Sequence, residues 1–203
     1  MKRILISQSI YKDLTRNEFG DKVDGRLIRF VLAAKYLPVV LSNYKVTRKN
    51  YGWDTSVLNQ YLNQVNVDGI LLTGGSDFGV DDNRDITEKA VLSWANKEKL
   101  PVLGLCRGMQ LMGKLEGGYL EEVSNHVREY HQLTGVISSR VNSYHKFAFR
   151  NLPSCFKILA TSSDGVIEAF QHRKNNWEGW MWHPEREENF QLFDLKGFQK
   201  VFG

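Results

Sequence analysis

Cysteine is scarce in this sequence of 203 residues, and no long hydrophobic run is present. The two cysteines, Cys106 and Cys155, form at most one disulfide, which excludes a disulfide-rich secreted domain. The apolar stretch near the start of the sequence is too short for a secretory signal or a membrane span. We therefore expect a cytoplasmic protein without a membrane partner, whose cysteines remain thiols.

Low-complexity segments, internal repeats and clusters of like charge are also missing. The residues are 42% hydrophobic and 25% charged, which is typical of a globular protein. The formal net charge is +4, but lysine and arginine are scattered, so we expect no nucleic-acid partner, and a small anionic substrate accounts for the charge as well. The length is sufficient for one core, and we predict a single domain over residues 1–203.

Strand-like and helix-like segments alternate in the first half of the sequence. The expected strands lie at residues 3–8, 38–43, 68–75 and 101–105, and the expected helices at 25–37, 54–65, 84–97 and 107–115. Asp54 is a candidate cap of the second helix. This alternation predicts an α/β fold, with a mostly parallel sheet flanked by helices and ligands bound beyond the carboxyl ends of the strands.

The second half of the sequence has a different pattern of short strands separated by turn residues. The expected strands lie at residues 133–141, 156–161, 166–170 and 179–182, followed by a closing helix at 189–202. We expect these strands to add antiparallel members to the sheet in its C-terminal half.

Cys106 lies between Gly104 and Gly108, where a predicted strand meets a predicted helix. A nucleophile elbow needs small residues at these two positions, because the strand and the helix converge there. The helix N-terminus favours a thiolate and supplies N–H groups for an oxyanion. The alternative is a buried cysteine that only packs.

His183 is the candidate base for such a cysteine, because histidine both accepts and returns a proton at neutral pH. It follows a predicted strand that Pro184 ends, so the imidazole lies at a strand end like Cys106. Glu185 is placed to orient the ring as the third member of a triad. The alternative is a strand-end histidine bonded to a backbone carbonyl.

Together these segments resemble the class I glutamine amidotransferase superfamily, in which the cysteine of a Gly-x-Cys-x-Gly-x-Gln elbow acts with a C-terminal His-Pro-Glu. The sequence is most similar to the γ-glutamyl hydrolase branch, over roughly residues 68–185. The segments that carry this similarity are LTGGSD, NRDITE, PVLGLCRGMQLM, EGGYL, VNSYHK, SDGVIEAF and WHPE.

The resemblance implies a role for each matching residue. Cys106 is the nucleophile, His183 the general acid and base, and Glu185 the residue that orients it. The resemblance also implies an oxyanion hole from the backbone N–H groups of Gly75 and Arg107. The residues implied in holding the glutamyl group are Gln110, Ser143, Tyr144 and His145.

Some positions depart from the branch or have two interpretations. The loop after LTGGSD is short, and Met181 stands where a glutamine is common. Arg84 and Asp85 either match the branch or begin a solvated helix. We interpret Cys155 as a packing residue without a partner. The remaining histidines, which are His126, His131 and His172, lack metal-ligand spacing, so we expect neither a metal nor another cofactor.

The expected function is a stand-alone enzyme that hydrolyses a γ-glutamyl amide of a small molecule through a cysteine thioester. The expected substrate is a γ-glutamyl nucleotide phosphoramidate, such as γ-glutamyl-CDP-amidate, or a γ-glutamyl amine conjugate. One alternative is a glutaminase subunit that delivers ammonia to a separate synthase, and another is a binding protein without activity. The sequence leaves open whether the chain forms a homo-oligomer.

Overall fold

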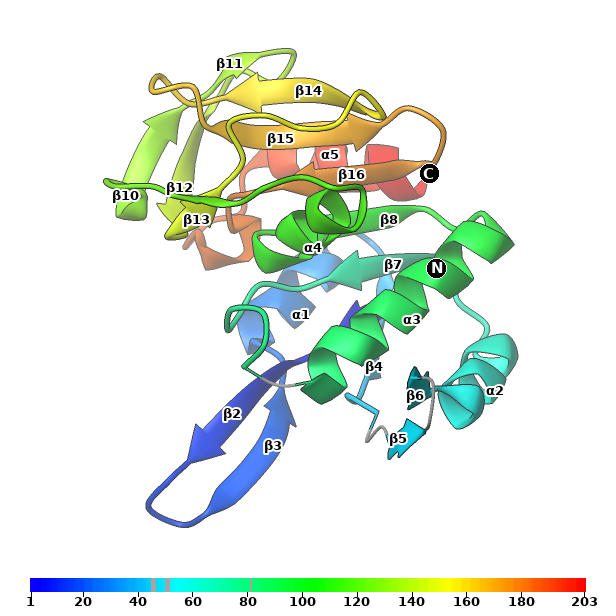
Figure 1. Ribbon diagram of the computed structural model, residues 1–203. Coiled ribbons are helices and arrows are strands. Elements are labelled where there is room, and N and C mark those ends of the chain that lie inside the picture. The colour runs from blue at the N-terminus through cyan, green and yellow to red at the C-terminus, as the bar shows by residue number, and fades with distance from the viewer. Residues whose placement is uncertain (45–46, 50–51, 81) are drawn as a thin grey trace.

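A computed structural model describes residues 1–44, 47–49, 52–80 and 82–203, and its centre is an eight-stranded sheet (Figure 1). In spatial order the strands are β11 (Thr134–Gly135), β14 (Phe156–Thr161), β15 (Ile167–His172), β16 (Trp177–Trp180), β8 (Val102–Leu105), β7 (Gly69–Leu72), β1 (Arg3–Ser7) and β4 (Leu37–Leu41). The run from β16 to β4 is parallel, and the run from β11 to β16 is antiparallel. The expected fold class is therefore confirmed.

Helices cover both faces of the sheet (Figure 1). One face carries α2 (Ser56–Gln64), α3 (Asp82–Glu98) and α4 (Arg107–Leu115), and the other carries α1 (Gly25–Ala33) and α5 (Leu192–Phe202). Along β1, Leu5 packs in the first core while Ile4 and Ile6 pack in the second. This double coverage explains why the parallel strands are continuously apolar in sequence. No helix of the described segments is long and apolar enough to cross a membrane.

The hairpin of β2 (Ser9–Asp13) and β3 (Glu18–Lys22) extends away from the body of the molecule and was not predicted (Figure 1). Its strands are mostly polar, so their hydrophobic pattern is weak. The residue types of the turn are a sequence signal, because aspartate and asparagine favour turns. In the structure Asp13 accepts hydrogen bonds from Thr15, and Asn17 has a φ of 52°.

Several expected elements differ in detail from the structure. The expected helix at 25–37 ends at Ala33, and Leu37 already belongs to β4. The expected strand at 133–141 is divided between β11, which joins the central sheet, and β12 (Arg140–Tyr144), which pairs with β10 (Val127–Gln132). The expected strand at 179–182 ends at Trp180. The helix α2 packs on α3, with Leu58 and Leu62 buried and Val57 and Tyr61 exposed.

The remaining short elements connect these parts. They are β5 (Thr47–Lys49), β6 (Gly52–Asp54), β9 (Glu121–Glu122), β13 (Phe147–Ala148) and the 3-10 helix η1 (Pro184–Arg186). The expected cap of α2 is displaced by one residue, because Thr55 is the cap position and Asp54 accepts a hydrogen bond from the Ser56 backbone.

We expect Gly104→Ala to lower the free energy of unfolding by about 1–3 kcal/mol, because the added methyl group overpacks the elbow. A Cβ at this position lies 2.6 Å from backbone atoms of Gly108 and Met109. Urea denaturation measures the loss. The control is Gly25→Ala, where no atom lies within 4 Å of an added Cβ. Equal stability of Gly104→Ala and wild type contradicts this account of the elbow.

Candidate active site

Cys106 occupies the sharp turn between β8 and α4 in a strained backbone conformation, with φ 47° and ψ −103°. Its N–H donates to the Trp180 carbonyl at 2.7 Å, and its carbonyl accepts from Gln110 N at 2.9 Å. Gly108 is required here because a Cβ would lie 2.5 Å from the Leu72 carbonyl oxygen. The side chain therefore projects at the carboxyl end of the sheet, above the start of α4.

His183 lies directly beyond β16, and its Nδ1–H donates to Glu185 Oε1 at 2.7 Å. Both side chains are buried. Burial opposes the charge on His183, but Glu185 and the hydrogen-bonded Cys106 outweigh it and raise the pKa of His183 to about 9. The structure thus brings together the three residues of the predicted triad, with Nε2 of His183 left for the thiol.

Asn142 on β12 fixes the backbone of His183, and sequence reasoning missed it. Its Nδ2 donates to the His183 carbonyl at 2.8 Å, and its Oδ1 accepts from the His183 N–H at 2.9 Å. Tyr144, on the same side of the strand, meets the imidazole edge-on with ring centres 5.9 Å apart. The guanidinium of Arg186 lies over the Tyr144 ring, 4.3 Å from its centre.

A buried carboxylate, Glu88 on α3, connects the elements around the elbow. It accepts hydrogen bonds from Arg84 Nε at 3.1 Å, from Ser7 Oγ at 2.8 Å and from the Arg107 guanidinium. Arg107 also pairs with Asp85. Arg84 is 1% exposed, so the interpretation as a solvated helix start is wrong. The sequence signals for this cluster were the NRDITE segment, which carries part of the family resemblance, and the i, i+4 spacing of Arg84 and Glu88.

Arg84 also positions the glycine turn after β7. Its Nη2 donates to the carbonyls of Thr73 and Gly74, each at 2.9 Å. Because a peptide bond is planar and trans, fixing the Gly74 carbonyl directs the N–H of Gly75 the opposite way. Gly75 has a φ of 134°, and Gly74 packs against His183, where a Cβ would lie 2.6 Å from Cε1. The turn therefore lies against the triad.

The residues predicted to hold a glutamyl group are divided by the structure. Gln110 is buried and donates to the Phe147 carbonyl at 2.7 Å. Tyr144 faces His183, as described above. Ser143 points to the other side of β12 and donates to the His126 carbonyl at 2.7 Å, and His145 lies beside the His126 ring. Of the three residues Ser143, Tyr144 and His145, Tyr144 is therefore the one whose side chain lies next to the triad.

A cavity of about 360 Å³ opens beside His183. Its lining residues are Ser9, Lys22, Val23, Asp24, Leu27, Thr73, Gly74, Gly75, Leu105, His183, Glu185 and Arg186. The hairpin therefore contributes to the cavity through Ser9 and Lys22. Asp24 is paired with Arg26, so Lys22 and Arg186 are the cationic groups that face a bound molecule.

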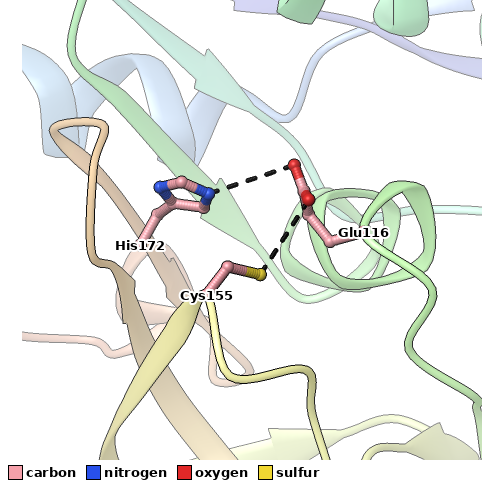
Figure 2. A group of neighbouring side chains, drawn as sticks. All are labelled: Glu116, Cys155 and His172. Carbon is pink, nitrogen blue, oxygen red and sulfur yellow. Dashed lines mark hydrogen bonds and ion pairs between the residues drawn. The ribbon is translucent and has the colours of Figure 1, made fainter.

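Cys155 has a polar neighbour, which corrects the expectation that it lacks a partner. Its Sγ lies 3.9 Å from Glu116 Oε2, and His172 Nε2 lies 3.9 Å from Oε1 (Figure 2). Burial raises the pKa of the Cys155 thiol, and Glu116 adds to the effect, so this thiol stays protonated at neutral pH. In Figure 2 both the Cys155 thiol and the His172 ring are directed at the Glu116 carboxylate.

His126 and His131, which lack metal-ligand spacing in the sequence, are neighbours in the structure. Each offers a ligand atom within 4.8 Å of the other and of a Glu168 carboxylate oxygen. Their spacing in the sequence is therefore no guide to their arrangement, because β10 and β15 bring them together through the fold.

Comparisons with known proteins bear on the family and the fold of this chain. The family described as Glutamine amidotransferase class-I matches residues 34–191. The gamma-glutamyl-CDP-amidate hydrolase of Campylobacter jejuni is 32% identical over 127 residues, which are 60% of this chain and 64% of that protein, slightly under two thirds of its length. A glutamine-hydrolyzing GMP synthase subunit from Methanococcus vannielii is 30% identical over 149 residues, covering 68% of this chain and 75% of that one.

The solved structures contain the same fold. A protein from Thermoplasma acidophilum, described as a GMP synthase subunit, superposes with a TM-score of 0.71 at 18% identity, covering 100% of this chain and 93% of that one. At this identity the likeness shows the fold.

We expect Glu185→Gln to lower the pKa of His183 from about 9, because the carboxylate charge beside Nδ1 is lost. In the wild type, the raised pKa means that charged His183 stabilises the fold below the ordinary value of 6.5, and this contribution is lost as the pH rises through about 9. In the variant the loss begins at lower pH. NMR titration of the ring and urea denaturation across this range measure both effects. Glu188→Gln, an exposed position, is the control for the charge change, and an unchanged titration in Glu185→Gln contradicts the prediction.

Proposed function

The chain belongs to the class-I glutamine amidotransferase family, and on that basis we propose that it hydrolyses a γ-glutamyl amide through a thioester on Cys106. One observation carries the proposal. The strained Cys106 lies at a helix N-terminus, hydrogen-bonded to a buried His183 whose other ring nitrogen is held by Glu185. This arrangement suits a nucleophile, a proton carrier and an orienting carboxylate.

In the proposed reaction the Cys106 thiolate attacks the γ-carbonyl carbon, and protonated His183 gives its proton to the leaving nitrogen as the C–N bond breaks. His183 then takes a proton from water, which attacks the thioester and releases glutamate and the free thiol. The raised pKa of His183 supports the first step, because the ring carries a proton at neutral pH. Glu185 balances the charge of the ring in each step in which His183 is protonated.

The proposed oxyanion hole consists of the backbone N–H groups of Gly75 and Arg107. Arg84 fixes the Gly74 carbonyl, which sets the direction of the first N–H, and the Arg107 side chain anchors the start of α4, which sets the second. Preorganised donors of this kind need no rearrangement when the negative charge develops. Arg84 and Glu88 are therefore proposed as positioning residues.

The proposed substrate class is a γ-glutamyl conjugate whose leaving group carries phosphate, with a γ-glutamyl nucleotide phosphoramidate preferred over a simple amine. Lys22 and Arg186 line the cavity beside His183 and supply positive charge for such a group. The similarity to the Campylobacter hydrolase supports the same choice.

A glutaminase subunit is the second candidate function. The similarity to the Methanococcus GMP synthase subunit favours it, because that protein is one subunit of a larger enzyme. The two candidates differ in whether the isolated chain is active and in whether free glutamine is the preferred substrate.

Cys106→Ala is expected to reduce turnover of a γ-glutamyl substrate by at least about 10³-fold, because the thioester cannot form. Cys155→Ala is the control and is expected to retain wild-type kcat. Adding His183→Ala to Cys106→Ala is expected to cost little more, since the two residues act as a unit. Activity of Cys106→Ala near the wild-type level, with an unchanged melting curve, rejects the thioester mechanism.

Arg84→Lys is expected to lower kcat by about 10²-fold with a small effect on KM, because lysine lacks the guanidinium fork that holds the Gly74 carbonyl. Lys89→Ala, an exposed change on the same helix, is the control. Steady-state kinetics and a melting curve separate this loss from unfolding. A rise in KM at constant kcat is the result that disagrees with a positioning role.

The isolated chain is expected to have a much higher kcat/KM for γ-glutamyl-CDP-amidate than for glutamine, because binding of the remote group positions the scissile amide. Added salt is expected to weaken binding of the charged substrate while leaving glutamine almost unaffected. Lys22→Ala is expected to raise KM for the charged substrate about tenfold. Arg16→Ala on the same hairpin does not line the cavity and is the control.

The hydrolase proposal fails if all substrates are turned over equally poorly and a synthase restores glutamine hydrolysis. That result favours the second candidate, a glutaminase subunit. High activity on a γ-glutamyl amine together with no effect of Lys22→Ala keeps the hydrolase and rejects the phosphate-bearing leaving group.

A further inference from the structure

A second group of chemically active side chains lies away from Cys106, where β10, β12 and β15 meet beside the antiparallel part of the sheet (Figure 1). It comprises His126, which precedes β10, His131 within β10, His145, which follows β12, and Glu168 on β15. The reaction proposed above uses none of these side chains. The family resemblance implied that His145 holds substrate, but the structure places it in this group.

Three ligand atoms of this group form a nearly regular triangle. His126 Nδ1 lies 3.3 Å from His145 Nε2 and 3.4 Å from Glu168 Oε1, and His145 Nε2 lies 3.5 Å from the same oxygen. These separations are long for hydrogen bonds, which cluster at about 2.9–3.0 Å. Ligands at about 2.0–2.1 Å from a tetrahedral zinc ion lie about 3.3 Å from one another, which is the spacing observed.

The carboxylate of Glu168 is buried without an adequate partner. The residue is 0% exposed, and among the described residues neither of its oxygens has a partner with hydrogen-bond geometry. His126 is 1% exposed and His145 is 3% exposed, so water does not solvate the group. His131 Nε2 is also buried without a partner in the described part of the chain. A buried carboxylate needs a positive charge beside it to offset the loss of hydration, and in this group either a protonated imidazole or a metal cation supplies that charge.

The hydrogen bond that His126 makes on the side of its ring away from the cluster is the kind that a metal-binding histidine makes. His126 Nε2 lies 3.1 Å from Asp164 Oδ2, so the Nε2–H donates outward and leaves the Nδ1 lone pair directed inward. Asp164 is itself held by Ser162 Oγ at 2.7 Å. The Asp164 side chain is 43% exposed, so the outer partner of His126 lies at the protein surface.

We propose that His126, His131, His145 and Glu168 bind a divalent zinc ion, with Asp164 as the outer partner of His126. His126, His145 and Glu168 already have the mutual spacing of tetrahedral zinc ligands, and His131, with a ligand atom within 4.8 Å of His126 and Glu168, is the candidate fourth ligand. The ion joins β10, β12 and β15, and β12 also carries Asn142, which holds His183. The proposed site therefore stabilises the strand that positions the active-site histidine.

The cluster in Figure 2 is a matched comparison that lacks this chemistry. His172 Nδ1 accepts hydrogen bonds from the backbone N–H groups of Lys174 and Asn175, at 3.1 and 3.0 Å. Its Nε2 therefore carries the proton and directs it at Glu116, so this nitrogen offers no lone pair to a metal. The tautomer, rather than the number of nearby ligands, separates the two clusters.

The test measures zinc binding by the full-length chain after removal of metals with EDTA. Zinc is added in competition with a chromophoric chelator, and the bound metal is counted by mass spectrometry. We expect the wild type to bind one zinc ion per chain, with a higher melting temperature in zinc than in EDTA. His131→Asn is expected to weaken binding at least tenfold, and Asp164→Asn about 10–100-fold.

Two controls remove the other places where zinc could bind. His172→Asn alters the cluster of Figure 2 and Cys106→Ala removes the active-site thiol, and both variants are expected to bind zinc as the wild type does. His131 is only half-buried, so His131→Asn is expected to melt in EDTA at the wild-type temperature. Failure of the folded wild type to retain zinc overturns the proposal. Equal zinc binding by His131→Asn, or loss of zinc in Cys106→Ala, also overturns it. None of these readouts depends on the proposed hydrolysis.

Discussion

The carboxylate of Glu88 is the constraint on which the rest of the site depends. It is fully buried and binds Arg84, Arg107 and Ser7, which belong to a helix, the start of the elbow helix and the first strand. Removing one partner from a buried ion pair costs about 3–5 kcal/mol, because the other charge is left without compensation. Through Arg84 the cluster holds the glycine turn, and through Arg107 it holds the elbow.

The two halves of the sheet make different contributions. The parallel half supplies Cys106 and the two candidate oxyanion donors, all at the carboxyl ends of strands. The end of β16 leads into His183, whose backbone is held by Asn142 of the separate β10–β12 ribbon and whose ring is held by Glu185 of η1. The pairing of β16 with β8 aligns these halves, and the Cys106 N–H donates directly to the last carbonyl of β16. A shift of one strand against the other would separate the nucleophile from the base.

The hairpin of β2 and β3 places this chain's own residues over one side of the cavity. The proposal of a hydrolase that acts alone depends on this feature, because Lys22 provides a charged group close to the triad from within the same chain. Family membership alone does not separate a hydrolase from a glutaminase subunit, since relatives described in both ways have similar identity. The distinction between them therefore lies in the loops around the site and not in the triad.

Local patterns in the sequence were sufficient for the α/β alternation and for the elbow. Apolar runs mark buried strands, and Gly104 and Gly108 are small because backbone lies within 2.6 Å of any added Cβ. The resemblance of the motifs then located His183 and Glu185. Tertiary structure alone decided which polar groups share the interior. Glu88 meets Arg107, 19 residues away, and Asn142 meets His183, 41 residues away, because the sheet order brings their strands and helices together. The same holds for His126, His131 and Glu168, whose neighbourhood depends on strand pairing that no local pattern encodes.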